Sequence, residues 1–169
     1  ALFSSTAWGA SYRLLGFRDG VSLVNHCGLF MNVNGAIFFQ GGAGTTLATS
    51  TNAMLISTWY YIEVKVTIGD AGVGNYEVRV NGTATGWLPS AVADTRNAGL
   101  AVIDVINFTC NATYNYIDDI YICDGVDATA TQGAANNDFK GDIRIDCYSP
   151  DDNGTNSDFT GSDADKTDN

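Results

Sequence analysis

The alternation of apolar and polar residues between Tyr60 and Ile68 constrains the fold more than any other feature of the sequence. Successive side chains of an extended strand point to opposite faces, so this alternation gathers the aliphatic residues of the segment on one face. Tyr76–Val80 repeats the pattern after a glycine-containing connection at positions 69–74. The two segments predict an antiparallel hairpin with one face in the core and a polar face toward solvent.

Charged residues on the polar face indicate the register of this hairpin. In one register Glu63 lies opposite Arg79, and Lys65 lies opposite Glu77. Cross-strand pairs of opposite charge each contribute about 0.2–1 kcal/mol, and a slip of one residue would exchange the two faces. We therefore expect each glutamate to have a basic partner across the hairpin.

Shorter segments with the same two-residue period occupy much of the remaining chain, with turn signals at intervals of roughly 8–12 residues. Asn34 and Gly35 predict a tight hairpin, because both central residues of the favoured two-residue turn need positive φ. No segment shows a sustained helical stripe with capping residues. The pattern predicts an all-β fold, a two-sheet antiparallel sandwich, with these further strands: Ser11–Arg18, Ser22–Asn25, Leu29–Val33, Ala36–Gln40, Thr45–Thr49, Leu100–Ile106, Tyr114–Cys123 and Asp142–Tyr148.

Composition and charge limit the domain organisation and the partners. We expect the sandwich to span residues 1–149, followed by an acidic tail or linker rich in Gly, Asn and Ser at residues 150–169. The net charge is −11 and no Lys/Arg cluster is present, so no nucleic-acid partner is expected. No apolar run approaches the roughly 18 residues of a membrane span, so membrane insertion is not expected.

The cysteines leave two alternatives open. They are not arranged in CxxC pairs and the chain has a single histidine, which argues against a zinc site. Two disulfides and four free thiols are equally compatible with the sequence. The four positions are Cys27, Cys110, Cys123 and Cys147.

Several strings, taken in order, resemble a known family. They are STWYYIEVKVTIGDAGVGNYEVRVNGT, DTRNAG, YIDDIYICDG and NNDFKGDIRIDCYSPDDNGTNSDFTGSD. Together they are similar to the LamG-like, concanavalin A-like lectin/glucanase domain of tailed-bacteriophage structural proteins, from about Trp59 to the end of the chain. The resemblance implies a jelly roll of two antiparallel sheets, displayed on the virion surface.

Because the resemblance extends to glucanases, catalysis must be considered. Glycoside hydrolysis needs two carboxyl groups about 5–5.5 Å or 6.5–9.5 Å apart. The glucanase arrangement of alternating Glu-x-Asp-x-Glu on one strand does not occur, and Glu63 and Glu77 are both expected to be paired. His26 is the only imidazole, and we interpret it as a hydrogen-bonded loop residue. The sequence therefore predicts a protein that is not an enzyme.

Asp118 and Asp119 are the most distinctive polar residues of a predicted strand. One of the two carboxylates should point inward. It either accepts backbone amides at the end of the strand, or it binds a structural calcium ion, which prefers carboxylate and carbonyl oxygens. Related sandwiches often hold one structural calcium ion near such a position.

Aromatic residues form core and binding surfaces alike. Trp59 stands where a strand begins, and we interpret it as a core residue. Trp87 lies in a turn-rich stretch where a large ring is harder to bury, and Tyr114 and Tyr116 alternate on one strand face. These last three are candidates for contact with a glycan or a neighbouring subunit, with packing as the alternative.

Two functions from different classes follow. The favoured one is a structural or decoration protein of a tailed-phage virion, with other copies of itself or a capsid or tail protein as partners. The alternative is an adhesion module, on a tail or head fibre, that recognises host-surface carbohydrate. A polysaccharide-degrading enzyme is a distant third. The structural role is favoured because the sequence lacks an evident cluster of exposed aromatic and acidic residues for a lectin groove.

Overall fold

The computed structural model describes residues 2–3, 11–41, 43–109, 115–123 and 139–141. Within these ranges the chain is all-β and contains no helix, which confirms the predicted fold class. The strands are β1 (Leu2–Phe3), β2 (Tyr12–Asp19), β3 (Val24–Met31), β4 (Ala36–Gly41), β5 (Thr46–Ala53), β6 (Thr58–Trp59), β7 (Ile62–Thr67), β8 (Asn75–Val80), β9 (Thr83–Val92), β10 (Val105–Phe108) and β11 (Asn115–Tyr116).

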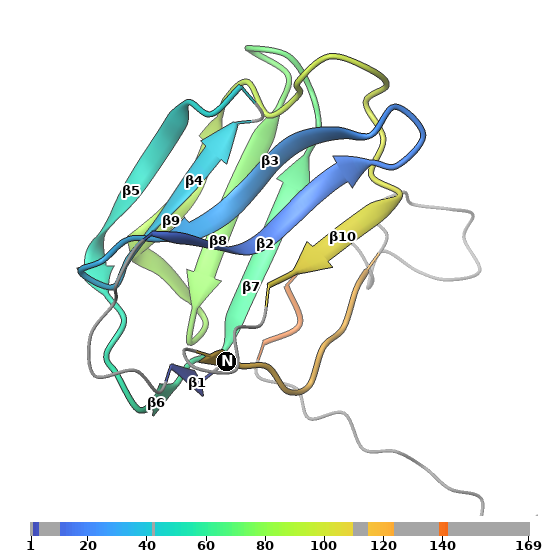
Figure 1. The fold of residues 1–169 in the computed structure, drawn as a ribbon. Coiled ribbons are helices and arrows are strands. Elements are labelled where there is room, and N and C mark those ends of the chain that lie inside the picture. The colour runs from blue at the N-terminus through green and yellow to red at the C-terminus, as the bar shows by residue number, and fades with distance from the viewer. Residues whose placement is uncertain (1, 4–10, 42, 110–114, 124–138, 142–169) are drawn as a thin grey trace, which may run out of the picture.

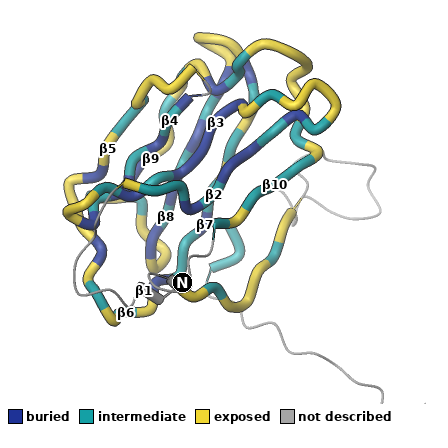
Figure 2. The backbone as a smooth tube through the Cα atoms, in the orientation of Figure 1, coloured by how far each residue is buried: buried dark blue, intermediate teal, exposed yellow. Residues whose placement is uncertain are grey.

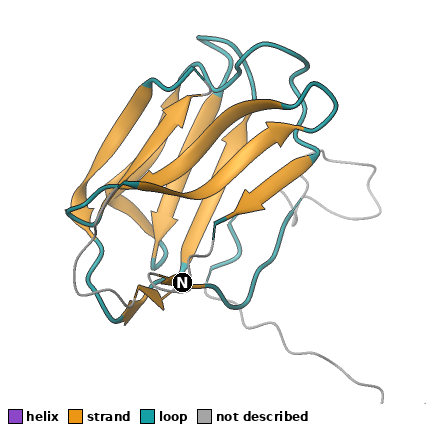
Figure 3. Cartoon of the chain, viewed as in Figure 1, coloured by secondary structure: helices purple, strands orange, loops and turns teal. Residues whose placement is uncertain are grey.

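Two antiparallel sheets face each other and form a sandwich (Figures 1 and 3). One has five strands in the order β10-β2-β3-β4-β5, and the other has three in the order β7-β8-β9. Along one side the sheets meet where β5 contacts β9, and Thr51 Oγ1 donates to the Gly86 carbonyl at 3.2 Å. A small third sheet, β11-β1-β6, lies at one end of the sandwich.

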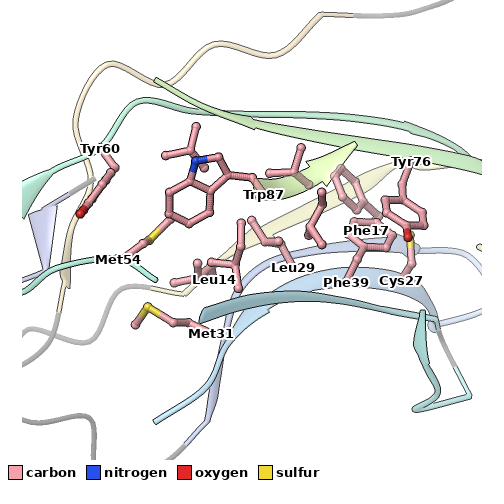
Figure 4. Close-up of a cluster of buried hydrophobic side chains, with 14 residues drawn as sticks. Leu14, Phe17, Cys27, Leu29, Met31, Phe39, Met54, Tyr60, Tyr76 and Trp87 are labelled. Atoms are coloured by element: carbon pink, nitrogen blue, oxygen red, sulfur yellow. The ribbon is translucent and has the colours of Figure 1, made fainter. Parts of the chain in front are cut away.

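The core fills the space between the two large sheets (Figures 2 and 4). Phe39 of β4 stacks on Tyr76 of β8 with ring centroids 4.6 Å apart, and both rings are buried. Further along, Tyr60 meets Trp87 edge to face at 6.3 Å. Offset-stacked and edge-to-face aromatic pairs add about 0.5–1.5 kcal/mol beyond the area that they bury.

The register of the β7–β8 hairpin is confirmed. Glu63 pairs with Arg79 and Lys65 pairs with Glu77 in the ladder. Alternation therefore predicted which residues lie opposite one another. As described below, it did not predict what covers the outer face of the hairpin.

Strand β3 is continuous, where the sequence indicated two shorter strands, Ser22–Asn25 and Leu29–Val33. Gly28, which lies between the two predicted segments, is part of the ladder. A Cβ at this position would be 2.7 Å from the Leu15 carbonyl oxygen of β2. Gly28 thus allows a close approach of two backbones inside the sheet.

Strand β9 was not predicted, because Gly86 and Pro89 read as turn residues. Gly86 has a φ of 76° and leaves no space for a Cβ against Asn52 of β5. Pro89 is tolerated because β9 is an edge strand of its sheet, where an amide hydrogen is dispensable. The ladder between β8 and β9 also contains register shifts, so β9 stays paired with β8 although its backbone is irregular.

The predicted strands Ser11–Arg18, Ala36–Gln40 and Thr45–Thr49 are confirmed as β2, β4 and β5. The others are shorter than expected or fall outside the described ranges. Leu100–Ile106 is represented by β10, which begins only at Val105, and Tyr114–Cys123 by the two residues of β11. The β3–β4 hairpin exists, but of its two expected positive-φ residues only Gly35 has one. The Asn32 side chain accepts the amides of Asn34 and Ala36 instead. Residues 142–169, with the predicted strand Asp142–Tyr148 and the tail, lie outside the described residues.

We predict that Phe39→Ala lowers the free energy of unfolding by about 3–5 kcal/mol, because it opens a cavity between the two sheets. Phe38→Ala is the matched control, since Phe38 stacks on Phe30 at 5.3 Å and is only half-buried. Urea denaturation followed by circular dichroism measures both. Equal losses in the two variants would contradict this placement of the core.

Candidate functional site

The outer face of β7 holds a buried carboxylate, that of Glu63, whose residue is only 4% exposed. Its Oε1 accepts a hydrogen bond from the Tyr121 hydroxyl at 2.6 Å. The backbone amides of Lys140 and Gly141 donate to the same oxygen at 2.8 and 3.0 Å. The expectation of a solvent-facing polar face is therefore wrong at Glu63, because segments from the C-terminal part of the chain cover it.

Aromatic rings extend this covering layer. The hydroxyls of Tyr61 and Tyr121 are 2.7 Å apart, which joins the two tyrosines in one hydrogen-bonded chain with Glu63. The Phe139 ring lies 3.9 Å from the Arg79 guanidinium carbon and 5.9 Å from Lys65 Nζ. Cations over an aromatic face at such distances are attracted by its quadrupole. Residues 115–123 and 139–141 are thus attached to the sheet by polar and cation–π contacts.

These contacts determine the charge state of Glu63. Burial acts to raise the pKa of its carboxyl, but hydrogen bonds from Tyr121, Tyr61 and the amides of residues 141 and 140 outweigh it and lower the pKa below its ordinary value. Glu77 is bonded to Arg79 Nε at 2.7 Å. Both glutamates therefore make contacts within the chain, and Glu63 is ionised at neutral pH.

We predict that Glu63→Gln lowers the free energy of unfolding at neutral pH by about 1.5–3 kcal/mol, the range for hydrogen bonds to charged groups. The pKa of Glu63 is lower in the folded protein than in the unfolded chain. The stabilisation by its carboxylate is therefore complete at a pH above the ordinary pKa of glutamate, and it is lost as the pH falls through the pKa of the folded state. The stabilities of wild type and variant should converge in acid. Urea titrations over a pH series measure this, with Glu77→Gln as control. A pH-independent difference would contradict the assignment.

Trp87 is a core residue, so it is not available for contact with a ligand or subunit. It is 9% exposed, and both it and Leu88 are buried although they are consecutive in β9. The register shift opposite Val78 and the positive φ of Gly86 turn the ring inward, toward Tyr60 (Figure 4). Of the two alternatives left open by the sequence, packing therefore applies to Trp87.

Trp59, which was expected in the core, is instead 53% exposed. In the small sheet, Trp59 of β6 and Tyr116 of β11 both pair with Leu2 of β1. Directly opposed residues share one face of a sheet, so the two aromatics lie on the same face, about 9–10 Å apart across two strand spacings. Tyr116 is 50% exposed. We call these two residues the aromatic pair. The third candidate, Tyr114, lies outside the described residues.

Asp118 and Asp119 are both exposed, so neither carboxylate points inward as expected. Asp119 has a φ of 49°, and its amide donates to Asp118 Oδ1 at 2.9 Å. Elsewhere in the described ranges, too, no three His, Cys, Asp or Glu residues gather into a potential metal site. The pair therefore fits the amide-accepting alternative better than a calcium site, and we assign no role to calcium from it.

We predict the same thermal unfolding midpoint in EDTA and in excess calcium, because two exposed carboxylates bind the ion too weakly to stabilise the fold. Circular dichroism on heating measures the midpoint, and Asp118→Asn provides the matched control. A calcium-dependent rise that disappears in Asp118→Asn would restore the metal site.

His26 and Cys27 are buried side by side in β3, whereas Cys123 is exposed. His26 is fully buried in β3 rather than in a loop, and its Nδ1 accepts the Asn97 amide at 3.3 Å, so the expected hydrogen bond is present. Cys27 and Cys123 are free thiols, and burial raises the pKa of Cys27 to about 12. The other two cysteines lie outside the described residues.

Asp19, which sequence reasoning did not single out, links two loops. It is fully buried at the end of β2, where Oδ1 accepts the amides of Val21 and Ser22 at 3.0 Å each. Its Oδ2 accepts the Leu100 amide at 3.3 Å. The amide of Ser22 makes the largest contribution to lowering the pKa of this carboxyl. Such a fully bonded carboxylate positions backbone rather than substrate.

Comparisons with known proteins find no matching family model, no matching curated protein and no matching solved structure. In the described part of the chain, no helix has the length and apolar character needed to cross a membrane.

Proposed function

We propose that this chain is a non-enzymatic structural domain of a tailed-phage particle, which covers or joins the particle surface through contacts with neighbouring subunits. The observation that carries the proposal is the aromatic pair. Trp59 and Tyr116 are about half exposed on one face of a small sheet. Tryptophan and tyrosine are enriched at protein interfaces, where they supply much of the binding energy.

The two glutamates do not favour glycosidase chemistry. A glycosidase needs one carboxyl group with a raised pKa as the acid. Glu63 instead has a lowered pKa, and Glu77 is bonded to Arg79. The particle context of the proposal comes only from the sequence strings that resemble LamG-like domains of phage structural proteins.

The alternative, recognition of host-surface glycan, would use the same residues. Two ring faces on one surface can each receive the apolar face of a sugar, so the aromatic pair also favours this second candidate. The two functions can be told apart by substituting the aromatic pair. A structural domain would lose its contact with a neighbouring subunit, and an adhesion module would lose its binding to glycan.

We predict that particles carrying the double substitution Trp59→Ser and Tyr116→Ser retain several-fold fewer copies of this protein, because the change removes two anchors of the contact. Quantitative mass spectrometry of purified particles measures the copy number. Val73→Ser is the control, since Val73 is 70% exposed on a different loop. The double variant should lose little of its thermal midpoint, because only about half of each residue is buried.

Full occupancy of the particle by the double variant would contradict the structural proposal. Binding of the wild-type domain to host-surface polysaccharide, lost in the double variant but kept in Val73→Ser, would support adhesion instead.

A further inference from the structure

The five-stranded sheet turns one face toward the core and the other face away from it (Figure 1). Its strands contain one acidic residue, Asp19, although the whole chain has 19 acidic and 8 basic residues. Asp19 is buried and accepts backbone amides, as described above. Arg13 lies toward the other end of β2, six residues or roughly 20 Å away. The sheet around Arg13 is therefore free of strand acids in a chain whose net charge is −11.

The pairing registers place a row of small and amide residues across the outer face. Asn107, Gly16, Gly28 and Gln40 are successive partners on β10, β2, β3 and β4. Directly opposed residues share one face of a sheet, and the next residue of β2, Phe17, belongs to the core. The row therefore faces outward. Its two glycines leave a strip without side chains between the two amides.

The Arg13 side chain lies along this strip. A Cβ at Gly16 would be 3.2 Å from Arg13 Cδ, Nε and Nη1, and a Cβ at Gly28 would be 3.5 Å from Arg13 Cδ. The guanidinium thus rests on glycine backbone, and a larger residue would displace it. Among the described residues, the partly exposed Arg13 side chain has no ion pair or hydrogen bond. Its planar fork is suited to a carboxylate, which it can bind through two hydrogen bonds.

Two phenylalanine rings stand beside the guanidinium. Phe30 is the direct partner of Arg13 on β3, and Phe38 follows on β4. The two rings stack on each other at 5.3 Å, and both residues are partly exposed. The outer face therefore presents a cation next to an apolar surface. This combination fits an occupant in which a carboxylate is adjacent to an apolar group.

From these observations we infer that the outer face around Arg13 binds the acidic segment at residues 150–169 of the same chain. The segment lies outside the described residues. It contains six aspartates and one lysine, so its charge complements that of Arg13. Phe159, its only aromatic residue, directly follows Asp158. These two residues supply the carboxylate and the apolar group that the face accommodates.

The acidic segment is long enough to reach Arg13 from the last described position. The Gly141 amide is bonded to Glu63 of β7, in the opposite sheet. The 16 residues between Gly141 and Asp158 can extend over roughly 50 Å. Packed sheets are only about 10 Å apart, so the chain can pass around the sandwich. Because the contact is intramolecular, the effective concentration is high, and a few side chains are sufficient.

Limited digestion of the full chain with chymotrypsin tests the inference, because the enzyme cleaves after aromatic residues. Mass spectrometry follows cleavage of the bond between Phe159 and Thr160. Arg13→Gln should speed this cleavage several-fold, because it releases the segment. In about 1 M salt, where the Debye length is about 3 Å, the wild type should be cleaved nearly as fast as the variant. Asp158→Asn should speed cleavage in the wild type but add little in Arg13→Gln, since residues in contact are not additive.

Arg96→Gln is the matched control, because it removes the same charge from an arginine that is already paired with Asp70 at 2.9 Å. Equal cleavage in wild type and Arg13→Gln, or equal acceleration by both arginine variants, would overturn the inference. Protection that fades on dilution would also overturn it, because the segment of another copy would then be bound. Arg13-dependent binding of alginate by a chain with an unprotected segment would assign the face to an external polyanion instead. The inference does not depend on the proposed function, which particle copy numbers test separately.

Discussion

A buried carboxylate needs hydrogen-bond donors, and at Glu63 this requirement determines how the C-terminal part of the chain is attached. Tyr121 and the amides of Lys140 and Gly141 supply the donors, from positions 58, 77 and 78 residues further along the chain. The inner face of β7 and β8 forms the core, while the outer face binds these segments. The hairpin is therefore the central element of the molecule, covered on both faces where the covering segments are described.

Asp19 applies the same principle at one end of the sandwich. Its oxygens bond amides from the turn after β2 and from the loop before β10. Apolar packing between the sheets stabilises the fold without fixing the course of its loops, because the hydrophobic effect is not directional. Buried carboxylates add directional bonds, so they position segments that have few apolar contacts of their own.

The sequence predicted those features that depend on local alternation. It gave the sandwich class and the pairing of Glu63 with Arg79, because the residues themselves carry the period of two. It placed Trp59 in the core, where the structure has it exposed, and it left Trp87 open between contact and packing. Extending the alternation backward from Glu63 through Tyr61 would have placed Trp59 on the outer face, so that signal was present. For Trp87 it was not, since a register shift in β9 turns the ring inward. Burial of Glu63 depends on segments more than fifty residues away, which no local pattern contains.

The two ends of the sandwich differ in chemistry, and this difference gives the molecule a direction. The aromatic pair lies at the end formed by β1, β6 and β11, and the loops at residues 20–23 and 97–104, which carry exposed aliphatic side chains, lie at the other (Figure 1).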